Sequence, residues 1–223
     1  RKMQRNSRSE DRALTILLNG LDDMEVVCSD FQQQQLTLYL HLLVKWNRAY
    51  NLTSAKNATD ITRLHLLDSL SISPFVNGER IIDVGTGAGL PGIPLAIMNP
   101  DKYFFLLDSN GKKTRFLFNV RLKLGLKNCF EIHERVEKYK PEKGFDMVLT
   151  RAFSQLSSML GHCEHLLSDG GLFCAMKGRL STSETNLLPF GYKIIKLEHL
   201  FVPTVVGDRY LIKIAKETIS FGA

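Results

Sequence analysis

Residues 80–94 read RIIDVGTGAGLPGIP: a short apolar strand runs through an acidic residue into a glycine-rich turn and then into the start of a helix. Gly85, Gly87 and Gly89 can adopt positive φ and carry no Cβ, so the backbone can bend sharply there and touch a ligand directly. A strand, a glycine turn and a helix in this order are typical of an α/β fold that binds a nucleotide-containing cofactor.

The residues after the turn help to choose between two cofactor classes. A dinucleotide places its pyrophosphate on free N–H groups at the helix N-terminus. Pro91 and Pro94 remove donors there, which disfavours a phosphate. S-adenosylmethionine has no phosphate and carries a cationic sulfonium, for which the acidic Asp83 is favourable. The turn therefore favours S-adenosylmethionine. Because residues 87–92 also fit the pattern G-x-G-x-x-G, a NAD-dependent oxidoreductase is the alternative.

A second acidic residue follows the next expected strand. Residues 103–108 form an apolar run that ends in Asp108, roughly 20 residues after the glycine turn. A carboxylate at this point can accept hydrogen bonds from both ribose hydroxyls of an adenosine. The other interpretation is an acid that caps the next helix near Lys112. Both cofactors contain adenosine, so Asp108 indicates the fold but not the cofactor.

Apolar strands alternate with helical stretches from residue 80 onward, which predicts a parallel, doubly wound sheet. The expected strands are 80–84, 103–108, 128–133, 145–150, 171–176, 192–199 and 208–215. The connection between the last two has no helical period, so we expect them to pair antiparallel. The predicted fold is α/β, a Rossmann-like class I methyltransferase with a seven-stranded, mostly parallel sheet and an antiparallel last strand.

A small helical region precedes this sheet. Apolar residues at helical spacing predict helices at about 10–19, 31–47 and 60–70. Asn77 and Gly78 then mark a hinge. We therefore expect a helical region over 1–77, with its first eight residues flexible, and an S-adenosylmethionine-binding methyltransferase domain over 78–223. The basic amino end is either an RNA-contacting arm or an unstructured terminus.

Composition limits the partners and the compartment. The chain has 29 Lys and Arg against 23 Asp and Glu, a net charge of +6, which is compatible with a polyanionic partner. It has no apolar run near the ~20 residues of a membrane span and no signal-peptide pattern, so we expect a cytoplasmic protein. The four cysteines are scattered. The motif HCEH at 162–165 is interpreted as a helix-surface cluster, and no metal is expected.

The residues after the fourth strand should face the reacting group, because ligands of open α/β sheets bind beyond the carboxyl ends of the strands. These residues, 150–153, include no cysteine for attack on a cytosine ring and no Asn/Asp-Pro-Pro-aromatic cluster for an exocyclic amine. Ribose methylation needs a lysine and an acid, but Arg151 stands here. Guanine N7 has a lone pair and no proton to lose, so its methylation needs no general base and can depend on orientation alone.

Several motifs together resemble one known family. They are NLT at 51–53, HLLDS at 65–69, DVGTGAGLPGIPLA at 83–96, LDS at 107–109 followed by Lys112 and Lys113, RVE at 135–137, and Arg151-Ala152. This set resembles the RsmG (GidB) family, bacterial enzymes that methylate N7 of a guanine in the 530 loop of 16S ribosomal RNA. The resemblance covers about residues 46–178, with a weaker match at 207–210. Lys113 replaces a frequent arginine, and DRY at 208–210 replaces the usual Glu-Arg-His.

The resemblance implies cofactor contacts at Gly85, Leu90, Val136, Glu137 and Arg151. With the residues of the turn, the expected cofactor site comprises Asp83, Gly85, Gly87, Gly89, Leu90, Asp108, Val136, Glu137 and Arg151. Two of these have plainer interpretations. Glu137 can be a solvated acid beside Lys138, and Arg151 can be a structural arginine paired with an acid.

The resemblance also implies an RNA partner, either 16S rRNA or a small ribosomal subunit or its assembly intermediate, bound by a monomer. Arg135 and Arg209 match family positions that contact RNA, and position alone adds Lys177 and Arg179. Arg151, Arg135 and Arg209 are also candidates for positioning the acceptor, and no residue is expected to act as a general base. Each of these cations can instead be an ordinary surface charge.

Two further interpretations come from the same residues. His65 and Asp68 lie one helical turn apart, which favours a packed, hydrogen-bonded pair over a catalytic one. A non-enzymatic RNA-binding protein on a methyltransferase scaffold is the second alternative function, although the intact glycine turn argues against it.

Overall fold

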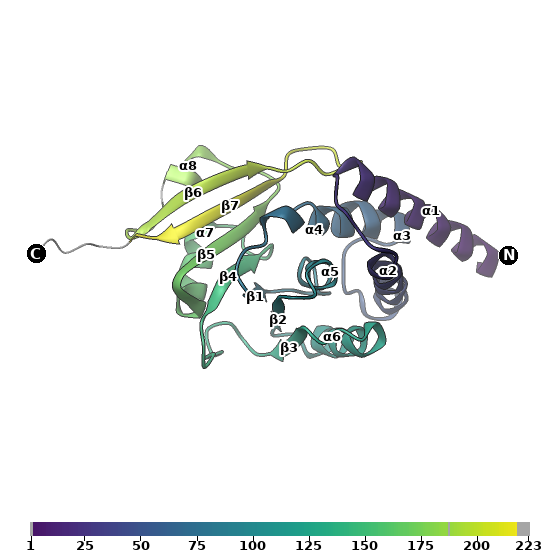
Figure 1. The fold of residues 1–223 in the computed structure, drawn as a ribbon, viewed down its shortest axis with the longest axis horizontal. Helices are drawn as coiled ribbons and strands as arrows, with labels where there is room; N and C mark the ends of the chain where they lie inside the picture. Colours follow the sequence, from purple (N-terminus) through teal and green to yellow (C-terminus); the bar gives the residue numbers. More distant parts are fainter. Residues whose placement is uncertain (1, 187, 218–223) are drawn as a thin grey trace, which may run out of the picture.

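One seven-stranded sheet runs through the molecule in the order β3-β2-β1-β4-β5-β7-β6 (Figure 1). The computed structural model describes residues 2–186 and 188–217. The strands are β1 Arg80–Val84, β2 Tyr103–Asp108, β3 Cys129–His133, β4 Phe145–Thr150, β5 Leu167–Lys177, β6 Tyr192–His199 and β7 Tyr210–Lys216. β1 to β5 pair parallel, and β7 lies antiparallel between β5 and β6. This is the Rossmann-like methyltransferase fold that we predicted.

The place of β7 inside the sheet follows from its residue pattern. Four consecutive residues of β7, Leu211 to Ile214, are buried, whereas every residue of β6 is exposed or only partly buried. A strand that is buried on both faces belongs inside a sheet, and a strand with solvated faces suits an edge. The antiparallel pairing brings Tyr210, at the start of β7, beside Lys177, at the carboxyl end of β5.

Helices cover both faces of the sheet. They are α1 Lys2–Asp23, α2 Asp30–Tyr50, α3 Ala58–Ile61, α4 Asp68–Leu70, α5 Gly92–Met98, α6 Gly111–Leu124, α7 Leu156–Cys163 and α8 Thr182–Asn186, with short 3₁₀ turns at Ser73–Phe75 and Glu164–Leu166. A π-helical turn, Thr62–Leu67, joins α3 to α4. The expected third helix is thus three helical segments, and the other two predicted helices are longer than we expected.

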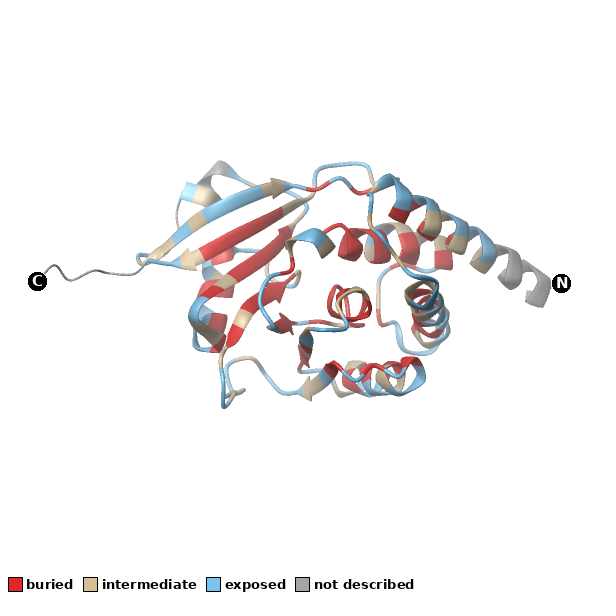
Figure 2. Cartoon of the chain, in the orientation of Figure 1, coloured by how far each residue is buried: buried red, intermediate tan, exposed pale blue. Residues whose placement is uncertain are grey.

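Each face of the sheet has its own hydrophobic core (Figure 2). Neighbouring residues of β1 point to opposite sides: Ile81 packs with α5, α6 and the N-terminal helices, and Ile82 packs with α7. The helices of the first 77 residues therefore share a core with the sheet. A division at residue 77 stays a prediction, and the side chains of residues 1–8 lie outside the described part. None of the described helices is long and apolar enough to span a membrane.

Candidate functional site

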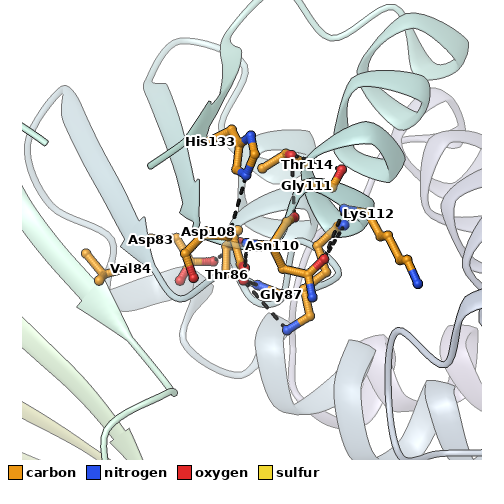
Figure 3. A network of polar contacts seen from close by, with 12 residues as sticks. Asp83, Val84, Thr86, Gly87, Asp108, Asn110, Gly111, Lys112, Thr114 and His133 are labelled. Carbon is orange, nitrogen blue, oxygen red and sulfur yellow. Dashed lines mark hydrogen bonds and ion pairs between the residues drawn. The ribbon is translucent and has the colours of Figure 1, made fainter. Parts of the chain in front are cut away.

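The glycine turn lies at the carboxyl ends of β1 and β2 (Figure 3). Gly85, Gly87 and Gly89 have φ of 69°, 63° and 88°, the left-handed region that these positions were expected to need. A Cβ on Gly85 would lie 2.6 Å from the Cβ of Ala152, so the chain after β4 packs directly on the turn. Around Gly87, in contrast, a Cβ would meet no atom closer than the Lys113 Nζ at 3.9 Å. The turn is therefore packed against Ala152 at Gly85 and has free space around Gly87.

The buried side chain of Asp83 stabilises the turn through two hydrogen bonds. Its Oδ2 accepts hydrogen bonds from the Thr86 hydroxyl at 2.7 Å and from the Gly92 N–H at 2.9 Å. Its other carboxylate oxygen is buried without a partner. Burial raises the pKa of Asp83 from 3.8 to about 6, against the opposite effect of these hydrogen bonds. The carboxylate is therefore ionised at neutral pH and can stabilise a nearby cation.

The start of α5 has few donors to offer a phosphate. The Gly92 N–H is bonded to Asp83, the Ile93 N–H donates to the Gly89 carbonyl at 2.7 Å, and Pro94 has no N–H. Leu90 is buried, and its N–H donates to the Thr86 carbonyl at 3.0 Å. The structure thus strengthens the case against a pyrophosphate, because the N–H groups of Gly92 and Ile93, which the prolines leave available, already donate to other groups.

Asp108 ends β2 and joins two loops (Figure 3). Its Oδ2 accepts the Gly87 N–H at 2.8 Å and lies 3.8 Å from Lys113 Nζ, while Oδ1 accepts the Asn110 N–H at 2.9 Å. Asn110, not Asp108, caps α6. Each carboxylate oxygen has two lone pairs, so Asp108 can still accept hydrogen bonds from a ligand.

Tyr39 is a support residue that the sequence reasoning missed. It is fully buried in α2, and its hydroxyl donates to the Ala88 carbonyl of the turn at 2.7 Å. Its apolar neighbours in sequence read as an ordinary helix face, so no local pattern indicates this contact. The N-terminal helices therefore contribute directly to the shape of the turn.

The loop after β3 brings Val136 and Glu137 near α7. Val136 packs on the core under α7, which also contacts Phe153. Glu137 is half exposed, and its Oε1 lies 3.5 Å from His162 Nε2. His162, Cys163 and His165 diverge: Cys163 is buried, His162 bonds the Ser158 carbonyl and His165 bonds the Tyr139 carbonyl. Val136 is thus partly buried against the core, and Glu137 is largely solvated.

A second polar cluster lies at the same edge of the sheet. Arg151 Nη1 donates to Asp68 Oδ2 at 3.0 Å, and Arg209 Nε lies 3.2 Å from Asp68 Oδ1. Asp68, Arg151 and Arg209 border a cavity of about 270 Å³. It is also lined by Met176, Lys177, Gly178, Leu200 and Tyr210. Arg151 thus has the acidic partner of the structural interpretation, but it also faces a cavity.

His65 does not form the expected pair with Asp68, and that interpretation is wrong. Both ring nitrogens of His65 are buried without a hydrogen-bond partner. Residue 65 belongs to the π-helical turn, whose wider winding changes the i, i+3 stacking of an α-helix. Burial, followed by the charge of Arg151, lowers the pKa of His65 to about 4, so the ring is neutral and a weak base.

The remaining candidate RNA contacts differ in accessibility. Arg135 and Arg179 are exposed. The Lys177 ammonium is bound by Glu184 at 2.6 Å and by the Ser154 carbonyl, and its side chain is 9% exposed. A phosphate would have to break this pair, so Arg135 and Arg179 are better placed to meet RNA.

The geometry agrees with the sequence comparisons. Residues 32–212 match the profile of the family described as rRNA small subunit methyltransferase G. The chain belongs to this family. It is 52% identical over 185 residues to a protein of Shewanella amazonensis named Ribosomal RNA small subunit methyltransferase G, covering 83% of this chain and 90% of the relative. It is 51% identical over 193 residues to a protein of the same name from Saccharophagus degradans, covering 86% of each.

Solved structures support the fold of this family member. The crystal structure of a ribosomal protein L11 methylase from Lactobacillus delbrueckii subsp. bulgaricus is similar with a TM-score of 0.52 and 14% identity, over 68% of this chain and 77% of that one. M. capricolum TrmK in complex with S-adenosyl-homocysteine gives a TM-score of 0.52 and 16% identity, over 67% and 68%. At these identities the likeness concerns the methyltransferase fold alone.

Proposed function

We propose that this protein transfers a methyl group from S-adenosylmethionine to N7 of a guanine in the 530 loop of 16S ribosomal RNA, directly and without a general base. The observation that carries the donor assignment is the glycine turn. Its helix start has its donors occupied or missing, while the buried Asp83 keeps one oxygen free. This arrangement suits a cation and not a pyrophosphate.

The residues present fit this donor. Gly87 has open space where a Cβ would stand, and Asp108 beside it can accept the ribose hydroxyls. Asp83 supplies negative charge, Val136 an apolar wall, and Arg151 a guanidinium at the end of β4. When bound, S-adenosylmethionine supplies an electrophilic methyl group. The chain's task is then to orient donor and acceptor and to exclude water, which can lower a barrier by up to ~7–11 kcal/mol.

Guanine N7 is favoured because the cysteines and His65 are poorly suited to act as a nucleophile or a general base. Burial raises the pKa values of the cysteines, those of Cys163 and Cys174 to about 12, so they are poor thiolate nucleophiles. His65, the histidine closest in sequence to the cluster, is a weak base. An unprotonated ring nitrogen needs neither group. Arg135, Arg209 and Arg179 are proposed to contact RNA phosphates in the cytoplasmic small subunit or its precursor.

The test is transfer of a tritiated methyl group from labelled S-adenosylmethionine to small ribosomal subunits that lack the modification. We expect label in one guanine of 16S rRNA, recovered as 7-methylguanosine after digestion. Label in protein, in a small metabolite or at another atom would contradict the proposal. As a control on the cofactor, S-adenosylmethionine should raise the melting temperature and NAD should not.

A further inference from the structure

The cavity beside the glycine turn contains a buried carboxylate that has unused hydrogen-bonding capacity. The Asp68 side chain is 8% exposed and lines the cavity together with Arg151 and Arg209. Its Oδ1 makes no hydrogen bond, since Arg209 Nε at 3.2 Å lies near it as a charge without hydrogen-bond geometry. Buried polar atoms in native proteins are generally satisfied, so an unsatisfied carboxylate oxygen in a cavity points to a missing donor.

The cavity is well placed to receive the base that is methylated. Arg151 lines it, and the next residue, Ala152, packs against Gly85 of the turn. The cavity and the proposed donor site therefore share a wall. Its volume of about 270 Å³ is below the ~300–1,000 Å³ of sites for larger ligands, which suits a single base.

The polar groups match one base edge in particular. The Watson–Crick edge of guanine presents O6, an acceptor, followed by the donors N1–H and N2–H. A carboxylate accepts two donors side by side, and an adjacent guanidinium donates to an acceptor. Arg151 beside Asp68 Oδ2, followed by Oδ1, gives this complementary order once Arg209 moves away from Oδ1. Adenine would instead place its N1 lone pair against the carboxylate.

We infer that Asp68 selects the acceptor by binding N1–H and N2–H of the target guanine in this cavity, with Arg151 donating to O6. The inference rests on the proposed guanine acceptor and names the residue that recognises it. Because N7 lies on the other side of O6 from N1, a base held by this edge leaves N7 free to face the donor. Arg209 then leaves Asp68 and is available to a phosphate.

The experiment combines two substrates with two proteins. Small subunits are rebuilt on ligated 16S rRNA that carries either guanine or inosine, which lacks the N2 amino group, at the acceptor position. For the wild type we expect kcat/KM to be about 10- to 100-fold lower with inosine. Asp68→Asn should lower kcat/KM for guanine by a similar factor and discriminate less than threefold between the two substrates.

Comparing the effect of Asp68→Asn on the two substrates shows whether Asp68 recognises the base or only holds the two arginines. If Asp68 only holds the two arginines in place, Asp68→Asn will slow both substrates equally and keep the full preference for guanine, and the inference is overturned. Equal rates of the wild type on guanine and inosine overturn it as well. Asp60→Asn, the same change in α3 and outside the cavity, is the matched control and should alter neither rate.

Two further outcomes are separable. If the wild type labels no guanine even in unmodified subunits rebuilt with guanine at the acceptor position, the proposed function fails, and this inference fails with it. If Asp68→Asn does not fold, as judged by its melting curve, the comparison is made with Asp68→Glu, which keeps the charge but moves the carboxylate. A preserved guanine preference in that variant also overturns the assignment.

Discussion

The glycine turn and the arginine cluster lie at the same edge of the sheet but are built in different ways. The turn is formed by consecutive residues whose N–H groups largely bond within the turn or to the end of β2. The cluster joins Asp68, Arg151 and Arg209, from three segments far apart in the chain, and leaves a carboxylate oxygen unsatisfied. The comparison teaches that the proposed donor site is a local motif of near neighbours, whereas the proposed acceptor site is assembled from distant segments and can still form new bonds.

The largest effect is expected for Gly85→Ala, which tests how rigid the turn is. The new Cβ would lie 2.6 Å from that of Ala152, and alanine would have to adopt a φ of 69°. We expect a loss of about 2–5 kcal/mol in the free energy of unfolding and no detectable cofactor binding. Urea unfolding and calorimetric titration measure both. Full cofactor affinity in this variant would show that the turn is more adaptable than we conclude.

Asp83→Asn separates the charge of the turn from its hydrogen bonds. Asparagine keeps an oxygen that can accept from Thr86 and Gly92, so the fold should persist, but the affinity for S-adenosylmethionine should fall about 10-fold or more. S-adenosylhomocysteine, which lacks the sulfonium, should lose less. Equal losses for the two ligands would argue against a role for this charge at the sulfur.

The same variant has a pH signature. Because folding raises the pKa of Asp83 to about 6, the protonated form stabilises the native state, and this contribution is lost as pH rises through 6. The melting temperature of Asp83→Asn relative to the wild type should therefore increase between pH 5 and pH 8. Cofactor affinity of the wild type should decrease below pH 6, as the carboxylate is neutralised. A difference in melting temperature that is independent of pH would contradict the assigned pKa.

Gly87→Ala tests the open side of the turn. Its φ of 63° costs alanine about 1 kcal/mol, but no atom lies closer than 3.9 Å to the new Cβ. We expect a small stability loss together with a roughly 10-fold loss of cofactor affinity. Gly125→Ala, at φ 64° in open space after α6, is the matched control, with similar stability loss and unchanged cofactor binding. Equal affinity in both variants would mean that Gly87 does not border the ligand.

Removing one arginine that is proposed to contact RNA should have a smaller effect, confined to the salt dependence of RNA binding. Arg135→Ala and Arg209→Ala are each expected to reduce the slope of log K against log salt by about 0.7–0.9, with cofactor affinity unchanged. Arg135 is exposed, while Arg209 must first leave Asp68. RNA titrations at several salt concentrations measure the slopes. An unchanged slope would refute a phosphate contact at that position.

For the last prediction, we expect that pH has no effect on the rate of methyl transfer near neutrality. If transfer needs no general base, its single-turnover rate at saturating cofactor should be flat between about pH 7 and 8.5. Asp83 is already ionised there, and His65, with a pKa of about 4, is already neutral. Rapid-quench measurements test this. A bell-shaped profile with two ionisations would indicate a base that the cluster does not reveal.

Much of the proposed donor site could be predicted from residue order. Strands β1 and β2 have the expected bounds, and the three glycines have the positive φ that the turn requires. The chemistry of residues 83–94 is local: an acid, a bend and two prolines act within one turn, so consecutive residues suffice to describe it. Even there, the hydrogen bond from Tyr39 to Ala88 comes from a distant helix and has no local signature.

The proposed acceptor site, formed by Asp68, Arg151 and Arg209, could not be derived from the order of neighbouring residues. Sequence spacing paired His65 with Asp68, but in the π-helical turn the two side chains form no hydrogen bond, and Asp68 pairs with Arg151 and Arg209 instead. Arg209 reaches the cluster because β7 runs antiparallel beside β5, an arrangement set by the burial of β7 on both faces. Residue order thus specifies the strands, the glycine turn and its charge, since these depend on near neighbours. The packing of the whole chain specifies which acid meets which arginine, since that depends on contacts between segments far apart in sequence.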